Sequence, residues 1–350
     1  MPPTLTRAER GETAVAAIVT VENLKTHFFL DEGTVQAVDG VDLIVPRGKT
    51  LCVVGESGCG KSITAFSIMH MISRPGRIVE GRVTLHRPDG DLVLTDQDED
   101  SQLLRSIRGG DIAMIFQEPM TSLSPVHTVG SQIAEAVSLH TDLDKKRTRE
   151  HALSMMERVG IPDPAQRFKQ YPHEMSGGLR QRSMVAMALS CRPSLLIADE
   201  PTTALDVTIQ AQILALMRQL QTEFDMAILL ITHDLGVVAQ MADDVAVMYM
   251  GRIVEFGTVK KIFADPQHPY TIALMRSLPG LGVERKSRLQ VIEGSVPDPF
   301  QRLEGCPFHP RCTEAEAGRC DRGGRPPLIE IEEGHHSACL KRHPEEATGA

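Results

Sequence analysis

The stretch Gly55-Glu56-Ser57-Gly58-Cys59-Gly60-Lys61-Ser62 reads G-x-x-x-x-G-K-S. An apolar run at 51–54 precedes it and predicts a buried parallel strand, and residues 63–69 after it can continue as a helix. A strand, a glycine loop and a helix N-terminus form the context in which this pattern binds phosphate, because glycine lets successive N–H groups turn inward. The stretch therefore predicts the phosphate loop of a nucleoside triphosphatase; the alternative is an ordinary glycine turn before a helix.

The positions of this loop have distinct expected roles at a bound nucleotide. Lys61 is expected to reach the β- and γ-phosphates, and the Ser62 hydroxyl is expected to ligate Mg²⁺. The full set of expected loop contacts to ATP is Gly55, Ser57, Gly58, Cys59, Gly60, Lys61, Ser62 and Ile63.

A second apolar run, at 195–198, ends in two acidic residues. If this strand is buried and its carboxyl end is open, Asp199 lies beside Mg²⁺ as the second part of the nucleotide site. Glu200 points differently and can polarise a water molecule for attack on the γ-phosphate. The alternative is a solvated acid pair at a strand end, which the glycine loop upstream disfavours.

The totals of the chain restrict its class. Its 350 residues suit about two or three domains. The net charge of −9, from 37 basic and 46 acidic residues, makes a nucleic-acid partner unexpected. No apolar run approaches the roughly 18 residues that span a bilayer, and the N-terminus lacks the pattern of a secretion signal. We therefore expect a cytoplasmic protein that can dock on membrane proteins.

The chain order predicts alternating strands and helices, hence an α/β fold. Residues 1–17 show no period and predict a flexible tail. Apolar positions at helical spacing predict a helical insertion at about 120–180, and continuous apolar runs near 195 and 228 predict central parallel strands. After 257 the sequence is rich in Pro, Gly, Cys and His and short on periodic structure. The segment 258–350 is therefore expected to be an irregular extension.

The motif Met175-Ser176-Gly177-Gly178-Leu179-Arg180-Gln181-Arg182 resembles the signature L-S-G-G-Q of the ATP-binding subunits of ABC transporters. It departs from that signature at Met175 and Leu179. Physically it is a second helix N-terminus with a glycine-lined entry, able to present N–H groups and a hydroxyl to an anion. In the family, that anion is the γ-phosphate of ATP held by the other subunit.

The resemblance covers residues 18–257 and implies further roles. It implies a P-loop NTPase (RecA-like) core with an antiparallel β subdomain and a helical subdomain. Gln117 then is the Q-loop residue, a Mg²⁺ ligand and part of the catalytic set, and His233 is the switch histidine. Asp206 marks the D-loop, and Phe28 stacks on adenine. Two subunits would face each other head to tail, so that each ATP lies between one phosphate loop and the opposite signature residues Ser176, Gly177 and Gly178.

Four of the seven cysteines cluster in the C-terminal segment, at Cys306, Cys312, Cys320 and Cys339. The loops between them are free to fold back, so the thiolates can converge on one metal centre. The spacing is not the short C-x-x-C of typical zinc sites, and four cysteines suit a [4Fe–4S] cluster. Zinc and free buried thiols are the alternatives. His309, His335 and His336 are expected to be solvated, although one of them can be a ligand.

The C-terminal segment also resembles the extension of oligopeptide/dipeptide importer ATPases, through His268-Pro269-Tyr270-Thr271 and the run Gly305-Cys306-Pro307-Phe308-His309-Pro310-Arg311-Cys312. In that branch the four cysteines are associated with an iron–sulfur cluster. The resemblance implies a peripheral ATPase subunit at the cytoplasmic face of the inner membrane. Its implied partners are a second ATPase subunit, with a heterodimer favoured, a pair of permease subunits and an extracytoplasmic substrate-binding protein.

Several functions remain open from the sequence. Peptides are the first choice of solute, and nickel, opines or glycosides are alternatives within the same machinery. A soluble ABC ATPase of DNA repair or translation belongs to another class, which the single copy of each motif and the lack of sustained heptads disfavour. A redox-sensing module built on the cysteines is a third hypothesis, separable by anaerobic purification with iron analysis.

Overall fold

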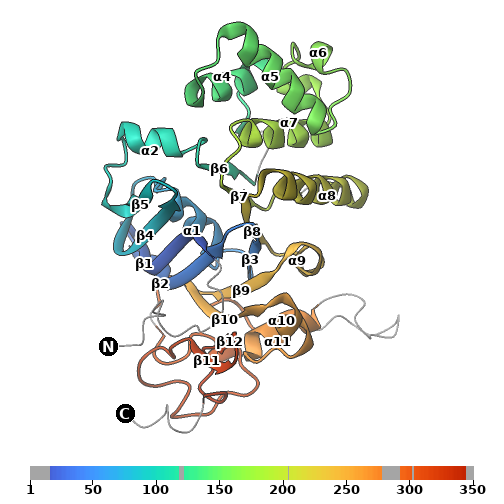
Figure 1. Cartoon of the computed structure of the whole chain (residues 1–350). Coiled ribbons are helices and arrows are strands. Elements are labelled where there is room, and N and C mark those ends of the chain that lie inside the picture. Colours follow the sequence, from blue (N-terminus) through green and yellow to red (C-terminus); the bar gives the residue numbers. More distant parts are fainter. Residues whose placement is uncertain (1–15, 118–121, 204, 278–291, 302, 344–350) are drawn as a thin grey trace.

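The computed structural model describes residues 16–117, 122–203, 205–277, 292–301 and 303–343. Two β-sheets form the middle of the molecule, a group of helices lies at one end and the C-terminal segment lies at the other (Figure 1). The tail expected at 1–17 falls outside the described residues as far as position 15, and strand β1 begins at Ala17. No described helix is long and apolar enough to span a bilayer.

The larger sheet has eight strands in the order β11-β12-β10-β9-β3-β8-β7-β6. Strands β9, β3, β8, β7 and β6 run parallel, and the apolar runs had predicted this for β3, β7 and β8. Because both faces of this parallel sheet are covered, its central strands β3, β7 and β8 are buried along their whole length and, apart from polar residues at their ends, are apolar rather than alternating. The bounds are β3 Thr50–Val54, β6 Ile112–Ile115, β7 Leu195–Asp199, β8 Ala227–Thr232, β9 Asp244–Tyr249, β10 Arg252–Thr258, β11 Ile329–Glu332 and β12 His335–Ser337.

The smaller sheet is antiparallel, in the order β2-β1-β4-β5. It packs against one face of the larger sheet, since Leu51 and Val53 of β3 share a buried cluster with its side chains. The other face of β3 contributes Cys52 and Val54 to a second cluster, which the helices cover. The strands are β1 Ala17–Leu30, β2 Gly33–Pro46, β4 Gly76–Arg87 and β5 Gly90–Val93.

The helical insertion predicted at about 120–180 is present as a group of helices at one end of the molecule (Figure 1). Side-chain oxygens at the helix starts fix several of these helices, as Thr128 and Asp144 do by accepting backbone N–H groups of the first turn. Over the whole described part of the chain, the α-helices are α1 Lys61–Ile68, α2 Gln102–Ile107, α4 Val129–His140, α5 Lys145–Arg158, α6 Pro164–Arg167, α7 Gly177–Leu189, α8 Val207–Phe224, α9 Leu235–Met241, α10 Val259–Ala264 and α11 Pro269–Arg276.

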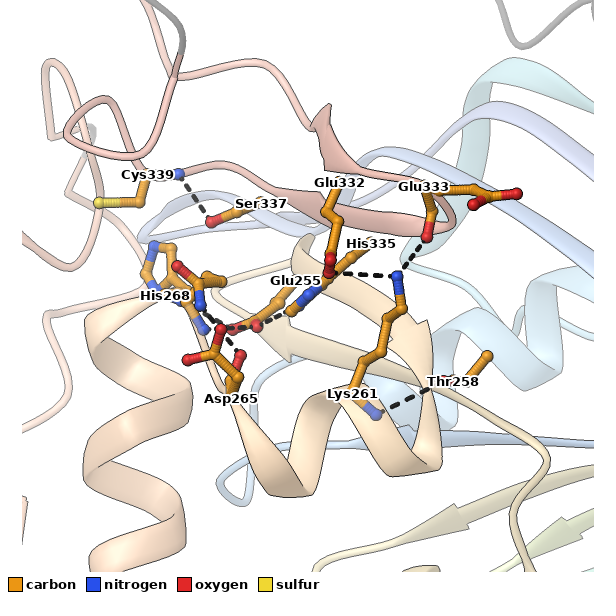
Figure 2. Close-up of polar contacts among 11 residues, drawn as sticks. Glu255, Thr258, Lys261, Asp265, His268, Glu332, Glu333, His335, Ser337 and Cys339 are labelled. Carbon is orange, nitrogen blue, oxygen red and sulfur yellow. Dashed lines mark hydrogen bonds and ion pairs between the residues drawn. The ribbon is translucent and has the colours of Figure 1, made fainter.

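The C-terminal segment is not the wholly irregular extension that the sequence predicted. Its hairpin β11–β12 extends the larger sheet, with β12 antiparallel to β10. The buried carboxylate of Glu255, on β10, accepts hydrogen bonds from the backbone N–H groups of Gln267 and His268 at 2.7 and 2.8 Å, and His335 Nε2 lies 2.8 Å from it (Figure 2). The sequence missed this pairing because β12 has only three residues and its partner lies about 80 positions earlier.

Candidate functional site

The phosphate loop connects β3 to α1, as predicted, and its backbone needs glycine. A Cβ atom at Gly55 would lie 2.2 Å from the carbonyl oxygen of Met248, and at Gly60 it would lie 2.2 Å from that of Ala37. Gly60 also has φ of +105°, which side-chain-bearing residues rarely adopt. Ser57 and Gly58 form the exposed tip, whereas Cys59 is buried beneath it. The loop is therefore held against β2 and β9 with its tip open.

The ammonium group of Lys61 lies inside this loop. The residue is 5% exposed, and Nζ donates to the carbonyl oxygens of Gly55 and Glu56 at 2.8 and 2.9 Å. Ser62 and Ile63 follow in the first turn of α1, where helix N–H groups lack intrahelical acceptors. The arrangement concentrates positive charge and N–H donors at one place, as anion binding requires.

Asp199 lies at the carboxyl end of β7 and is 2% exposed. Burial raises the pKa of this carboxyl group, and a hydrogen bond from Ser62 acts in the opposite direction. Its Oδ1 is buried and has no hydrogen-bond partner among the described residues. An orphaned carboxylate oxygen beside a serine hydroxyl suits a hard cation with oxygen ligands, so these residues fit Mg²⁺.

Three residues that the sequence assigned to catalysis meet at Glu200. Gln117 Nε2 donates to Oε2 at 3.1 Å, and His233 Nδ1 lies 3.0 Å from Oε1. Thr203, which the sequence did not indicate, donates to Oε2 at 3.0 Å. Burial acts to raise the pKa of Glu200, but the hydrogen bonds from His233 and Thr203 outweigh it and lower that pKa. The carboxyl group is therefore held ionised.

The backbone of Glu200 is also unusual, with φ of +46°. A non-glycine residue in this left-handed region costs of order 1–3 kcal/mol and persists only where its surroundings fix it. Strain of this kind concentrates at functional sites.

The signature residues lie at a different helix start from the phosphate loop. Ser176 precedes α7, its hydroxyl accepts the N–H of Leu179, and Ser176 and Gly177 are exposed. Asp206 caps α8 in the same way, accepting the N–H of Ile209 at 2.9 Å. The two helix starts adjoin, because a Cβ atom at Gly178 would lie 3.1 Å from Ile209. Ser176, Gly177 and Asp206 are exposed at these two helix starts and are therefore accessible to a partner.

Comparison with known proteins decides the family. The model described as "ABC transporter" matches residues 38–203, and the model described as "Oligopeptide/dipeptide transporter, C-terminal region" matches residues 254–320. The dipeptide transport ATP-binding protein DppD of Bacillus subtilis is 51% identical over 306 residues, covering 87% of this chain and 89% of that protein. This chain belongs to the oligopeptide/dipeptide branch of the ABC transporter ATP-binding subunits.

Other relatives agree with this membership. The oligopeptide transport ATP-binding protein AppD of Bacillus subtilis is 50% identical, over 86% of this chain and 90% of that protein. Among solved structures, cbiO1 of Clostridium perfringens, part of the ABC transporter complex cbiONQ, is similar with a TM-score of 0.58 and 26% identity, over 71% of this chain and 91% of that one. The dimeric bacterial ABC transporter cassette MJ0796 has a TM-score of 0.61 at 24% identity, over 69% and 98%, which shows the fold.

Phe28 is the nucleotide residue whose role depends most on the resemblance to ABC ATPases. It lies in β1 and is half-buried, with its ring against Gly76 of the neighbouring strand. Its stacking on adenine stays a prediction.

The four C-terminal cysteines of this ABC subunit line one small cavity. Burial raises the pKa of the Cys306 thiol to about 11. Within the described residues, however, no three His, Cys, Asp or Glu side chains stand close enough to hold a metal ion. The cavity therefore gathers Cys306, Cys312, Cys320 and Cys339 without the metal-ligand geometry that the sequence predicted. At Cys320, Sγ instead accepts the N–H of Glu316 at 3.5 Å.

The prediction that the nearby histidines are solvated is wrong for two of them. His335 and His336 are both buried in β12, and His335 is bonded to Glu255. His309 is half-buried and bonds the carbonyl oxygen of Cys306. The pairing of β12 with β10 buries the side chains of His335 and His336. A strand of only three residues leaves no pattern in the sequence from which this burial could be predicted.

Proposed function

We propose that this chain binds and hydrolyses ATP and powers the import of di- and oligopeptides through partner permease subunits. The observation that carries the ATPase part is the contact of Gln117 and His233 with Glu200, one residue beyond the buried Asp199. Glu200, held ionised, accepts a proton from the attacking water, while Gln117 and His233 orient its carboxylate. Lys61 and the loop N–H groups bind the transferred phosphates.

Mg²⁺ is the cation that this site fits. Ser62, Asp199 and Gln117 are the residues that would hold it, and when bound it neutralises charge on the β- and γ-phosphates. The orphaned Oδ1 of Asp199 supports this assignment.

A second ATPase subunit completes the site in this proposal. The exposed Ser176 and Gly177 and the neighbouring Asp206 offer helix N-termini to a phosphate of the partner's ATP. A heterodimer is favoured. Nucleotide-driven closing and opening of the pair would then be transmitted to the permease subunits at the cytoplasmic face of the membrane, with an extracytoplasmic binding protein delivering the solute.

Peptides are the proposed solute because of the C-terminal region. The segment 254–320 matches the oligopeptide/dipeptide transporter model, and relatives at 50–51% identity are named for dipeptide and oligopeptide transport. In cells that make this chain, Glu200→Gln should abolish uptake of labelled di- and tetrapeptides. Unchanged peptide uptake with loss of nickel, opine or glycoside uptake would contradict the proposed solute.

We also propose that the cavity lined by the four cysteines holds a [4Fe–4S] cluster, with Zn²⁺ as the alternative. Its support is that all four thiols border one cavity, although they stem from segments up to 33 positions apart. Anaerobically purified protein should contain iron and acid-labile sulfide. Stoichiometric zinc without iron would favour the alternative, and absence of both metals would contradict a metal site.

A further inference from the structure

An arginine of the C-terminal segment contacts the phosphate loop directly. Arg311 Nη1 and Nη2 donate to Oε2 and Oε1 of Glu56 at 2.7 and 2.9 Å, across 255 positions of sequence. Glu56 is the second residue of the phosphate loop. The Arg311 side chain is 4% exposed and that of Glu56 is 26% exposed. A bidentate, largely buried pair of this kind fixes orientation as well as charge.

The guanidinium group of Arg311 is itself held firmly. Its Nε donates to the carbonyl oxygen of Glu293 at 3.2 Å, and Nη1 lies 3.4 Å from the hydroxyl of Tyr249. The rings of Tyr249 and Phe308 each lie 5.9 Å from it. Arg311 therefore reaches the loop from a buried position beside two aromatic rings, and not from the exposed surface.

The main chain of Glu56 is held from two further sides. Its N–H donates to the hydroxyl of the buried Tyr270, on α11, at 2.8 Å, and its carbonyl oxygen accepts from Lys61 Nζ at 2.9 Å. The C-terminal segment thus supplies two of the groups that hold this residue, and Lys61 of the phosphate loop supplies the third. Any shift of Glu56 would move the acceptor that positions the lysine.

Charge gives Arg311 a second reason to act on nucleotide binding. The Glu56 carboxylate lies at the edge of a loop that must bind a highly negative triphosphate. Without a cation beside it, this carboxylate would repel the phosphates, because unlike a surface charge it is only partly screened by water.

We propose that Arg311 is a positioning residue for ATP binding, which fixes the phosphate loop and neutralises it through Glu56. The inference rests on the proposed ATPase function and extends it to the C-terminal segment. Arg311 is carried by the short turn between Cys306 and Cys312, so the cysteine-lined cavity and the phosphate loop are joined through one segment.

The competing explanation is that Arg311 merely attaches the C-terminal segment to the ATPase body. Arg325 provides a matched control, since it is a partly buried arginine of the same segment and pairs with Asp39 of β2. The test compares Arg311→Gln, Arg311→Lys and Arg325→Gln in the full chain. For each variant the Kd of a fluorescent ATP analogue with Mg²⁺ is measured, together with the thermal unfolding midpoint and the iron and zinc content.

We expect Arg311→Gln to raise the Kd at least tenfold, Arg311→Lys to raise it less, and Arg325→Gln to leave it within twofold of the unmodified chain. Lysine keeps the charge but not the bidentate geometry, so partial rescue separates the two contributions. A Kd for Arg311→Gln equal to that for Arg325→Gln would overturn the proposal. If the unmodified chain failed to bind the analogue, the ATPase function itself would be overturned.

A double-mutant cycle tests direct coupling and covers the case in which Arg311→Gln does not fold. Glu56→Gln changes no residue of the C-terminal segment, removes the repulsive charge and should raise the Kd less than Arg311→Gln. The double variant Glu56→Gln/Arg311→Gln should bind no more weakly than Arg311→Gln alone. Effects on Kd that multiply in the double variant would show that Arg311 does not act through Glu56 and would overturn the proposal. If Glu56→Gln and Arg311→Lys fold but Arg311→Gln does not, the Kd is compared for those two variants. A Kd equal to that of the unmodified chain in both would likewise overturn the proposal.

Discussion

Replacing Glu255 with Gln tests how the C-terminal segment is joined to the ATPase body. The carboxylate is fully buried and has three partners, the N–H groups of Gln267 and His268 and the ring of His335 (Figure 2). Glutamine has nearly the same shape but only one acceptor oxygen. Its NH₂ group must therefore face a backbone N–H donor or the histidine, and at least one donor loses its acceptor.

The expected loss follows from this geometry. A buried donor without an acceptor costs about 1–3 kcal/mol, and the remaining hydrogen bonds weaken because their acceptor is no longer charged. We therefore expect the local opening of β12 to become easier by about 2 kcal/mol or more. Since each 1.4 kcal/mol is about tenfold, this corresponds to roughly 30-fold faster amide exchange.

Hydrogen exchange with mass spectrometry measures this opening directly. Peptides that contain Ala338, whose N–H donates to Val254 in β10, report on strand pairing. Glu332→Gln is the matched control, because Glu332 lies in the same hairpin but is exposed and pairs with Lys261 at the surface (Figure 2). The control should change stability by less than about 0.5 kcal/mol. Equal exchange rates in Glu255→Gln and Glu332→Gln would refute the reasoning.

Three further predictions concern the nucleotide site. Lys61→Ala should weaken ATP binding or turnover at least tenfold, as measured by equilibrium binding and phosphate release, because it removes the ammonium group inside the loop; unchanged kinetics would contradict the phosphate contact. Asp199→Asn should abolish the dependence of ATP affinity on Mg²⁺, so that EDTA titration no longer alters it, whereas an unaltered Mg²⁺ dependence would place the cation elsewhere. Ser176→Arg should leave ATP binding by the single chain within about twofold but prevent its ATP-dependent pairing with the second ATPase subunit in size-exclusion chromatography, because Ser176 lies at an exposed helix start. Loss of ATP binding by the single chain would place the signature at the chain's own nucleotide.

The strand–loop–helix unit and the central strands were predictable because their signals are local. The phosphate loop needs glycines at fixed spacing, and the central parallel strands are runs of apolar residues with polar residues only at their ends. Spacing alone did not show that Gln117 and His233 would meet at Glu200, since they lie 83 and 33 positions from it. The resemblance to ABC ATPases placed Gln117 and His233 in the catalytic set but did not predict these contacts.

The contacts that the sequence did not indicate are long-range and depend on single side chains. In the sequence, Arg311 is only one residue of a run that two cysteines flank. The residues next to it in the sequence do not indicate a partner 255 positions away. Glu255 and His335 appear as ordinary polar residues of short segments, and their burial follows only from the pairing of β12 with β10. Thr203 contacts Glu200 at a point where the backbone of Glu200 is left-handed. Non-glycine residues rarely adopt this conformation, so the sequence did not indicate it.

The role of Glu200 is tested most directly by separating ATP binding from ATP cleavage in one variant. Glu200→Gln keeps the shape of the side chain and removes the group that accepts the proton. We predict that phosphate release falls by about 10²–10⁴-fold while affinity for ATP with Mg²⁺ stays within about threefold. Full hydrolysis by this variant, or loss of ATP binding together with turnover, would contradict the assignment.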